Sequence, residues 1–132
     1  MPVLLDHLIV PSHEKNRGAR FLGEILGLPW EEAAGEFAPV FVNDTLTIDF
    51  ADRESFESHH YCFSLTPDEF DGVLGRLKQR GIPYRSSPRG PIDMKINERN
   101  GGRNLYWFDD DGHNWEMLTV SYARQRQPAA TA

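Results

Sequence analysis

The chain has 132 residues, 39% of them hydrophobic and 26% charged, a composition typical of one globular domain that buries its own core. Its formal net charge is −6 and no segment clusters lysine and arginine, which argues against a protein that binds the phosphate backbone of nucleic acids. Because Cys62 is the single cysteine, no intramolecular disulfide can form, and without a signal-like start or a bilayer-spanning apolar run we expect a cytoplasmic protein with no membrane partner.

The first half of the chain predicts a strand, a helix and three short strands. The first strand covers Leu4–Val10 and ends at Pro11. The helix covers about Ser12–Leu26, and Gly27 is expected to end it in the left-handed conformation. The three strands that follow are expected near Trp30–Ala33, Phe37–Val42 and Leu46–Ala51.

The second half predicts the same order of elements. An alternating strand covers His60–Leu65, and Thr66–Glu69 has the residues of a helix capping box. Gly81 is expected to end this helix. The remaining strands are expected around Pro83–Ser86, Asn104–Phe108 and Asn114–Val120.

An internal repeat relates the two halves. Gly27–Trp30 and Gly81–Tyr84 share the pattern Gly, aliphatic, Pro, aromatic, and His7 and His60 lie 20 and 21 residues before these glycines. Such self-similarity fixes an architecture. It predicts an α+β fold of two βαβββ modules, at about 1–54 and 57–122, that form one domain with a curled mixed sheet around a metal-binding cleft. Residues 123–132 are expected to be a flexible tail.

The segment Ser86–Arg103 has no counterpart in the first half, and it contains several glycines and prolines. Long loops in compact domains are often lids or binding segments, so this segment is a candidate part of a substrate site. A surface excursion without a role is the alternative.

Three side chains are candidate metal ligands. Equivalent strands of duplicated modules usually pack near a pseudo-twofold axis, so His7 and His60 are expected to face one cavity. Alternation turns Glu116 away from the core face of its strand and towards that cavity. Two imidazoles and one carboxylate, with positions left open for substrate, suit a divalent ion such as Fe, Mn, Zn, Ni or Co.

Asp49 occupies the position in the first module that Glu116 occupies in the second. It is a candidate fourth ligand or a catalytic base beside the metal. A carboxylate that ends a strand in solvent is the alternative.

The motifs DHLIV at 6–10, HYCFSL at 60–65 and DDDGHNWE at 109–116 resemble the signatures of the vicinal oxygen chelate superfamily. This group includes glyoxalase I, extradiol dioxygenases, fosfomycin-resistance enzymes and bleomycin-resistance proteins. The resemblance extends from about Leu4 to Val120 and implies paired βαβββ units in a homodimer. It also implies His7, His60 and Glu116 as the metal ligands.

Within that superfamily, the chain most resembles the fosfomycin-resistance thiol transferases. Tyr106 matches a tyrosine that contacts substrate in those enzymes. Ile9 stands where they carry a threonine, and Asn100–Arg103 replaces their potassium-binding loop, which argues against fosfomycin as the substrate. With Cys62 on the predicted cavity face, the residues expected to bind substrate are Tyr106, Ile9, Cys62 and Arg103.

Several residues keep a second interpretation. Cys62 is either a small packing residue or a nucleophile, and no activating base is evident in the sequence. Tyr106 is either part of the core or a hydroxyl in the pocket. His59 is a rival to His60 as a ligand, while His13 and His113, at a helix start and a turn, are expected to be solvated.

Two functions follow from these expectations. The first is a metal-dependent enzyme that holds two neighbouring oxygens of a small substrate, as a lyase or isomerase, a thiol transferase or a dioxygenase. Glu116 would be a ligand, and Asp49 or a bound hydroxide would be the base. The second is a drug- or metabolite-binding protein of the bleomycin-resistance type that performs no chemistry.

Overall fold

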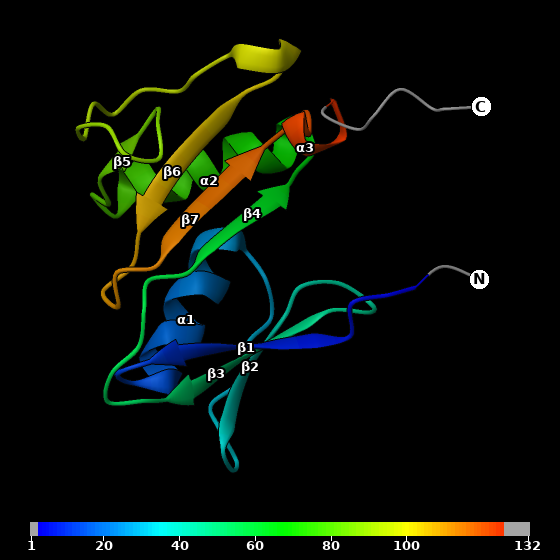
Figure 1. Ribbon diagram of the computed structural model, residues 1–132, viewed down its shortest axis with the longest axis vertical. Coiled ribbons are helices and arrows are strands. Elements are labelled where there is room, and N and C mark those ends of the chain that lie inside the picture. Colours follow the sequence, from blue (N-terminus) through cyan, green and yellow to red (C-terminus); the bar gives the residue numbers. More distant parts are fainter. Residues whose placement is uncertain (1–2, 126–132) are drawn as a thin grey trace. The chain divides into compact units, whose positions relative to one another are not determined.

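Each half of the chain folds as a helix packed on a mixed β-sheet, so the α+β class and the repeated modules are confirmed (Figure 1). The computed structural model describes residues 3–125. The first unit runs to His59 and includes Asp109–His113, and the second comprises His60–Phe108 and the residues from Asn114 onward. Among the described residues, no helix combines the length and apolar character that a bilayer span needs.

The first unit has a three-stranded sheet in the order β1-β3-β2. Strand β1 is parallel to β3, and β2 is antiparallel to β3. The strand predicted at Trp30–Ala33 is reduced to one bridge between Trp30 and Val40. The elements of this unit are β1 (His7–Ser12), α1 (Lys15–Leu26), β2 (Phe37–Phe41) and β3 (Thr47–Asp52).

The second unit has a four-stranded sheet in the order β4-β7-β6-β5. Its βαβββ succession is complete, because Tyr84 lies in a short strand where the first unit has only the bridge at Trp30. The elements are β4 (His60–Ser64), α2 (Pro67–Gln79), β5 (Tyr84–Arg85), the 3₁₀ turn η1 (Arg99–Gly101), β6 (Asn104–Phe108), β7 (Asn114–Leu118) and α3 (Tyr122–Gln125).

The two sheets share one register. In the first unit Ile9 stands opposite Asp49, and in the second Cys62 stands opposite Glu116. Each pair lies two positions beyond a histidine, His7 or His60. The predicted equivalence of Asp49 and Glu116 is therefore confirmed at the level of strand pairing.

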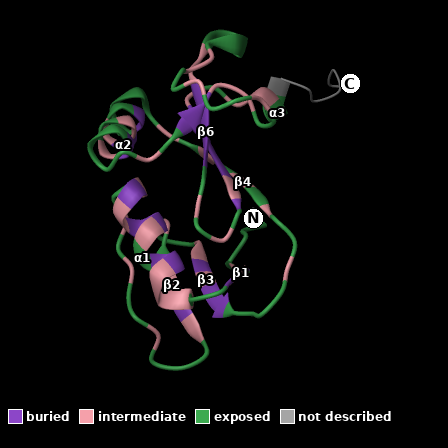
Figure 2. Cartoon of the chain, turned by 90° about the vertical axis from the view of Figure 1, so that its left-hand side faces the viewer, coloured by how far each residue is buried: buried purple, intermediate pink, exposed green. Residues whose placement is uncertain are grey.

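The core of the first unit lies between α1 and one face of its sheet. Buried residues of β1, β2 and β3 alternate with more exposed ones, as expected for a sheet with one covered face (Figure 2). A Cβ atom at Gly18 would lie 2.7 Å from Cδ2 of Phe50, so glycine lets the helix approach the sheet closely. Gly27 ends α1 with φ of 70° and ψ of 34°, the left-handed conformation that the sequence predicted.

The core of the second unit is centred on Trp115. The rings of Tyr61 and Phe63 from β4 stack on it, with centroids 5.2 and 5.9 Å away. Helix α2 adds the apolar stripe of Phe70, Val73 and Leu77 (Figure 2). Because neighbours along a strand point to opposite faces, this core turns His60, Cys62 and Glu116 to the other face of the sheet.

Most element boundaries differ from the prediction by one to three residues, and two of the differences have a structural meaning. Strand β1 starts at His7 and continues through Pro11 to Ser12. Proline has no backbone N–H to donate, but β1 is an edge strand, so Pro11 can lie in it without breaking a hydrogen bond between strands. The expected flexible tail begins inside α3, which runs to Gln125. The rest of that tail, 126–132, lies outside the described residues.

The capping box of α2 is confirmed. The Glu69 backbone N–H donates to Thr66 Oγ1 over 3.2 Å, and the Thr66 backbone N–H donates to Glu69 Oε1 over 2.8 Å. The hydrogen bond from the Thr66 backbone lowers the pKa of Glu69 below its ordinary value. The ionised carboxylate therefore stabilises the start of this helix.

Replacing Glu69 with glutamine is expected to reduce the loss of stability in acid. A carboxyl with a lowered pKa stabilises the fold above its unfolded pKa, and this stabilisation is lost as the pH falls through the lower folded value. Thermal unfolding from pH 7 to about pH 3 measures the difference in Tm between the wild type and Glu69→Gln. This difference should shrink below about pH 4.5. A difference in Tm that stays constant over this range would contradict the assignment, and Glu57→Gln is the exposed control.

The turn between β6 and β7 belongs to the first unit, and its His113 is fully buried, so the expectation that His113 is solvated is wrong. The His59 backbone N–H donates to Nδ1 of His113 over 2.9 Å, and Nε2 faces the Pro11 carbonyl oxygen at 2.7 Å. Because a carbonyl only accepts, the proton lies on Nε2. Phe56 stacks on the ring at 5.3 Å, so His113 is a structural residue.

Candidate metal centre

Glu116 is the centre of a polar cluster in the second unit. Its side chain is completely buried, and two hydrogen-bond donors and one histidine nitrogen surround it. Tyr122 OH donates to Oε1 over 2.8 Å, Asn104 Nδ2 donates to Oε2 over 3.0 Å, and His60 Nε2 lies 3.1 Å from Oε1. A buried carboxylate is costly unless it is hydrogen-bonded or bound to a cation, and this one has partners for both oxygens.

His60 is oriented as a metal ligand would be. Its Nδ1 donates to the Asn114 carbonyl oxygen over 3.1 Å, which fixes the ring and leaves Nε2 directed at Glu116. A histidine that binds a metal usually donates its other ring N–H in this way. Ligand atoms about 2.1 Å from one ion and about 90° apart stand roughly 3 Å from each other, so the observed spacing fits a shared divalent ion.

The first unit carries the third predicted ligand. Nδ1 of His7 lies 2.8 Å from Asp6 Oδ2, so this ring too is oriented through Nδ1 and leaves Nε2 available. The hydrogen bond to Asp6 raises the pKa of His7, and the negative charges of Asp6 and Asp49 raise it further. Asp49 is half-buried on the same face of the sheet, opposite Ile9.

The predicted set is thus divided between the two units. His60 and Glu116 meet within the second unit, and His7 stands with Asp49 and Ile9 in the first. Over residues 3–125, no three histidine, cysteine, aspartate or glutamate side chains form a group that could hold a metal. The rival ligand His59 uses its backbone N–H on His113 and belongs to the first unit.

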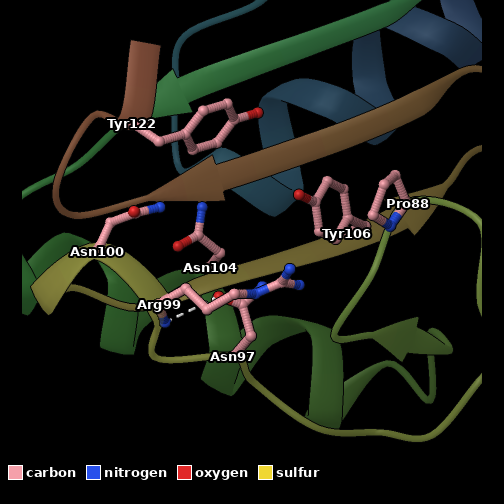
Figure 3. A pocket seen from close by; sticks show the side chains of 7 residues that line it. All are labelled: Pro88, Asn97, Arg99, Asn100, Asn104, Tyr106 and Tyr122. Atoms are coloured by element: carbon pink, nitrogen blue, oxygen red, sulfur yellow. Dashed lines mark hydrogen bonds between the residues drawn. The ribbon is translucent and has the colours of Figure 1, made fainter. Parts of the chain in front are cut away.

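A pocket of about 580 Å³ opens beside Glu116 in the second unit. Figure 3 shows Asn104 and Tyr106, which both come from β6, together with Tyr122, which comes from α3. Its described lining consists of Pro88, Asn97, Arg99, Asn100, Asn104, Tyr106 and Tyr122. The segment Ser86–Arg103 supplies four of these residues, so it contributes to a pocket rather than forming a plain excursion.

The hydroxyl and thiol groups around Glu116 keep their protons. Burial and the neighbouring Glu116 charge raise the pKa of Tyr106, and burial with the hydrogen bond to Glu116 raises the pKa of Tyr122 to about 12. Cys62 is exposed as a residue, yet burial around its sulfur and the charge of Glu116 raise the pKa of its thiol. A protonated thiol is a poor nucleophile, which favours the interpretation of Cys62 as a packing residue.

Arg103 is engaged elsewhere in the second unit. Its Nη1 donates to Asp71 Oδ1 over 2.7 Å, its Nη2 donates to the Pro67 carbonyl, and its guanidinium covers the Phe70 ring. Arg103 does not appear in the described lining of the 580 Å³ pocket. It anchors the loop before β6 to helix α2.

Sequence reasoning missed two partners of Glu116. Asn104 faces it because β6 and β7 are antiparallel neighbours, and Tyr122 reaches it from α3. The alternation of β6, which places Asn104 on the face of Tyr106, was a usable signal for the first. Nothing in the sequence around Tyr122 distinguishes it from the start of a flexible tail.

No protein-family model matches this sequence, and no curated protein matches it either. Solved structures do match. Oxidase ChaP-H2 is 39% identical, with a TM-score of 0.86 over 92% of this chain and 97% of that one. Oxidase ChaP-H1 is 37% identical, with a TM-score of 0.85 over 92% and 98%.

A more distant match shares the fold alone. A variant of the fosfomycin-resistance protein FosX from Listeria monocytogenes, in complex with Mn(II) and 1S,2S-dihydroxypropylphosphonic acid, is 20% identical with a TM-score of 0.68. The alignment covers 96% of this chain and 100% of that chain. This match shows the same fold over nearly the whole chain.

Proposed function

Because this chain belongs to the vicinal oxygen chelate superfamily, we propose that it is a divalent-metal-dependent enzyme that oxidises a small, oxygen-rich molecule, with dioxygen as the oxidant that is reduced. Two solved relatives that share 39% and 37% of its sequence are named oxidases. Oxidation is therefore better supported for this chain than the lyase, isomerase or thiol transferase reactions that the same ligands could serve.

The observation that carries the proposal is the His60–Glu116 pair. Nε2 and Oε1 stand 3.1 Å apart, and each side chain is held by further hydrogen bonds. Two of the residues that donate to Glu116, Asn104 and Tyr122, line the 580 Å³ pocket. Preorganised ligands of this kind bind metal without reordering of their side chains. His7, held by Asp6, is the proposed third ligand.

A divalent ion at these ligands would act as a Lewis acid towards two neighbouring oxygens of the substrate. Tyr106 and Asn104 then lie where they can position the substrate, and the protonated Tyr122 donates to the Glu116 carboxylate. Asp49 remains the candidate base, since its carboxylate is close enough to His7 to raise the pKa of that histidine. Cys62 and Ile9, which occupy equivalent positions in the two sheets, are proposed as walls of the site.

We further propose a homodimer. The three proposed ligands stand in two units, so His7 can come from the same chain as His60 and Glu116 or from a second copy. Mixing separately inactive His7→Ala and Glu116→Ala variants distinguishes these cases. Recovery of metal binding in the mixture is expected if the ligands come from two chains, and none is expected if one chain supplies all three.

The experiment for the proposed function starts from protein stripped of metal with EDTA and reloaded without oxygen with Fe(II), Mn(II) or Zn(II). We expect about one ion per chain and oxygen consumption with a catechol as the test substrate, in the metal-loaded protein only. The proposal would be refuted if the purified protein contained no divalent ion and also bound none on reloading. Stoichiometric metal without turnover of catechols, methylglyoxal–glutathione adducts or fosfomycin would favour a binding protein instead.

A further inference from the structure

Arg85 is a buried cation on the same face of the sheet as Glu116. It is only 8% exposed. Arg85 stands opposite Tyr106, and Tyr106 stands opposite Glu116, so the three side chains form a row across β5, β6 and β7. Paired residues of neighbouring strands point to the same side of a sheet. Arg85 therefore lies on the same face of the sheet as the proposed metal ligand Glu116, two strands away from it.

The hydrogen bonds of this guanidinium are incomplete. Nη1 donates to the Gly90 carbonyl over 3.3 Å, and the group covers the Phe108 ring at 4.0 Å from its centroid. Nε and Nη2 are buried, and no group of residues 3–125 accepts from them. No carboxylate of the described chain forms an ion pair with Arg85, although a buried arginine without one is unusual.

The two unpartnered donors have a defined geometry. The N–H bonds of Nε and Nη2 point the same way along one side of the planar guanidinium. This side binds both oxygens of a carboxylate through two parallel hydrogen bonds. A single carbonyl or a water molecule would satisfy only part of the fork.

A small cavity lies against this residue. Its volume is about 110 Å³, which equals the share of roughly three or four water molecules in the liquid and accommodates a carboxylate with a few carbon atoms. It is lined by Pro83, Arg85, Ile92, Tyr106, Trp107 and Phe108. Tyr106 also lines the 580 Å³ pocket, so one side chain borders both spaces.

We propose that Arg85 binds a carboxylate of the substrate through Nε and Nη2. This inference rests on the proposed function, and it narrows the substrate to an organic acid. Two strand spacings of about 4.8 Å separate the backbones of Arg85 and Glu116, so the acid group and the oxygens at the metal belong to different ends of the molecule. Arg85 then sets which end of the substrate reaches His60 and Glu116.

Propionate is the probe, and neutral propionamide is its matched control. Titrations use the full chain stripped of metal, so that binding of propionate to a metal cannot contribute. Propionate is expected to raise the Tm of the wild type and to change its tryptophan fluorescence, because Trp107 borders the cavity, while propionamide has little effect. Arg85→Gln should weaken propionate binding at least about tenfold, and Arg85→Lys should weaken it as well because it keeps the charge but loses the fork.

Arg89→Gln, which changes an exposed arginine in the same loop, is the control and should bind propionate as the wild type does. Metal content is measured for every variant, since a failure to load metal bears on the proposed function and not on Arg85. No response of the wild type to propionate, or equal propionate affinity in wild type and Arg85→Gln, would overturn the inference. Loss of binding in Arg99→Gln alone would also overturn it, because Arg99 lines the larger pocket.

Discussion

Glu116→Gln is expected to bind Mn(II) at least about 100-fold more weakly than the wild type, with its fold preserved. Loss of a residue that only orients a ligand already costs roughly 10- to 100-fold in metal affinity, so loss of the charged ligand itself should cost no less. Glutamine keeps the shape of the side chain and keeps one acceptor oxygen for the donors of Asn104 and Tyr122. Isothermal titration of the metal-free protein with Mn(II) measures the change.

The matched control is Glu54→Gln, which removes an exposed carboxylate of the first unit. Its affinity for Mn(II) should equal that of the wild type. If Glu116→Gln kept stoichiometric, tight Mn(II), the cluster around Glu116 would be a structural hydrogen-bond network and the metal would bind elsewhere.

His113→Ala is expected to lower the free energy of unfolding by about 2–4 kcal/mol. The substitution leaves a cavity beside Phe56 and removes the ring that bonds the Pro11 carbonyl and the His59 N–H, two backbone groups that are only partly exposed. Urea unfolding followed by tryptophan fluorescence measures the loss.

His13→Ala is the natural comparison, because His13 is exposed and its ring also contacts Phe56, at 4.6 Å. We expect its effect on unfolding to stay below about 0.5 kcal/mol. Equal losses in the two variants would mean that contact with Phe56, rather than the two backbone hydrogen bonds, makes His113 important.

Much of the fold was predictable because the sequence contains an internal repeat, in which both halves have the same order of elements. The repeated Gly, aliphatic, Pro, aromatic pattern marks Trp30 and Tyr84, and each residue pairs antiparallel with the next strand of its unit, β2 or β6. The predicted strand at Trp30–Ala33 failed because one bridge is all that the chain forms there. Propensity cannot distinguish a bridge from a short strand, since both place the same aromatic residue in extended backbone.

The site was predictable where strand periodicity governs it. The alternation of side chains along each strand predicted that His60 and Glu116 point to the face opposite the core. They lie next to each other because β4 and β7 pair in parallel. The positions of Arg85 and Tyr122 in the site were not predicted, because each residue lies in an element too short to show a periodic pattern of hydrophobic residues. The burial of His113 was not predicted, because a turn residue is buried by contacts with residues far away in the sequence, here with Pro11.

The shared register of the two sheets places two equivalent carboxylates in unlike surroundings. Asp49 and Glu116 occupy the same position of the pairing, and their side chains differ by a single methylene. Where Glu116 has Tyr106 as its neighbour on the adjoining strand, Asp49 has Pro39, whose side chain carries no hydrogen-bond donor. The same strand position, built twice, therefore gives one carboxylate enclosed by hydrogen bonds and a second, half-buried one close to His7.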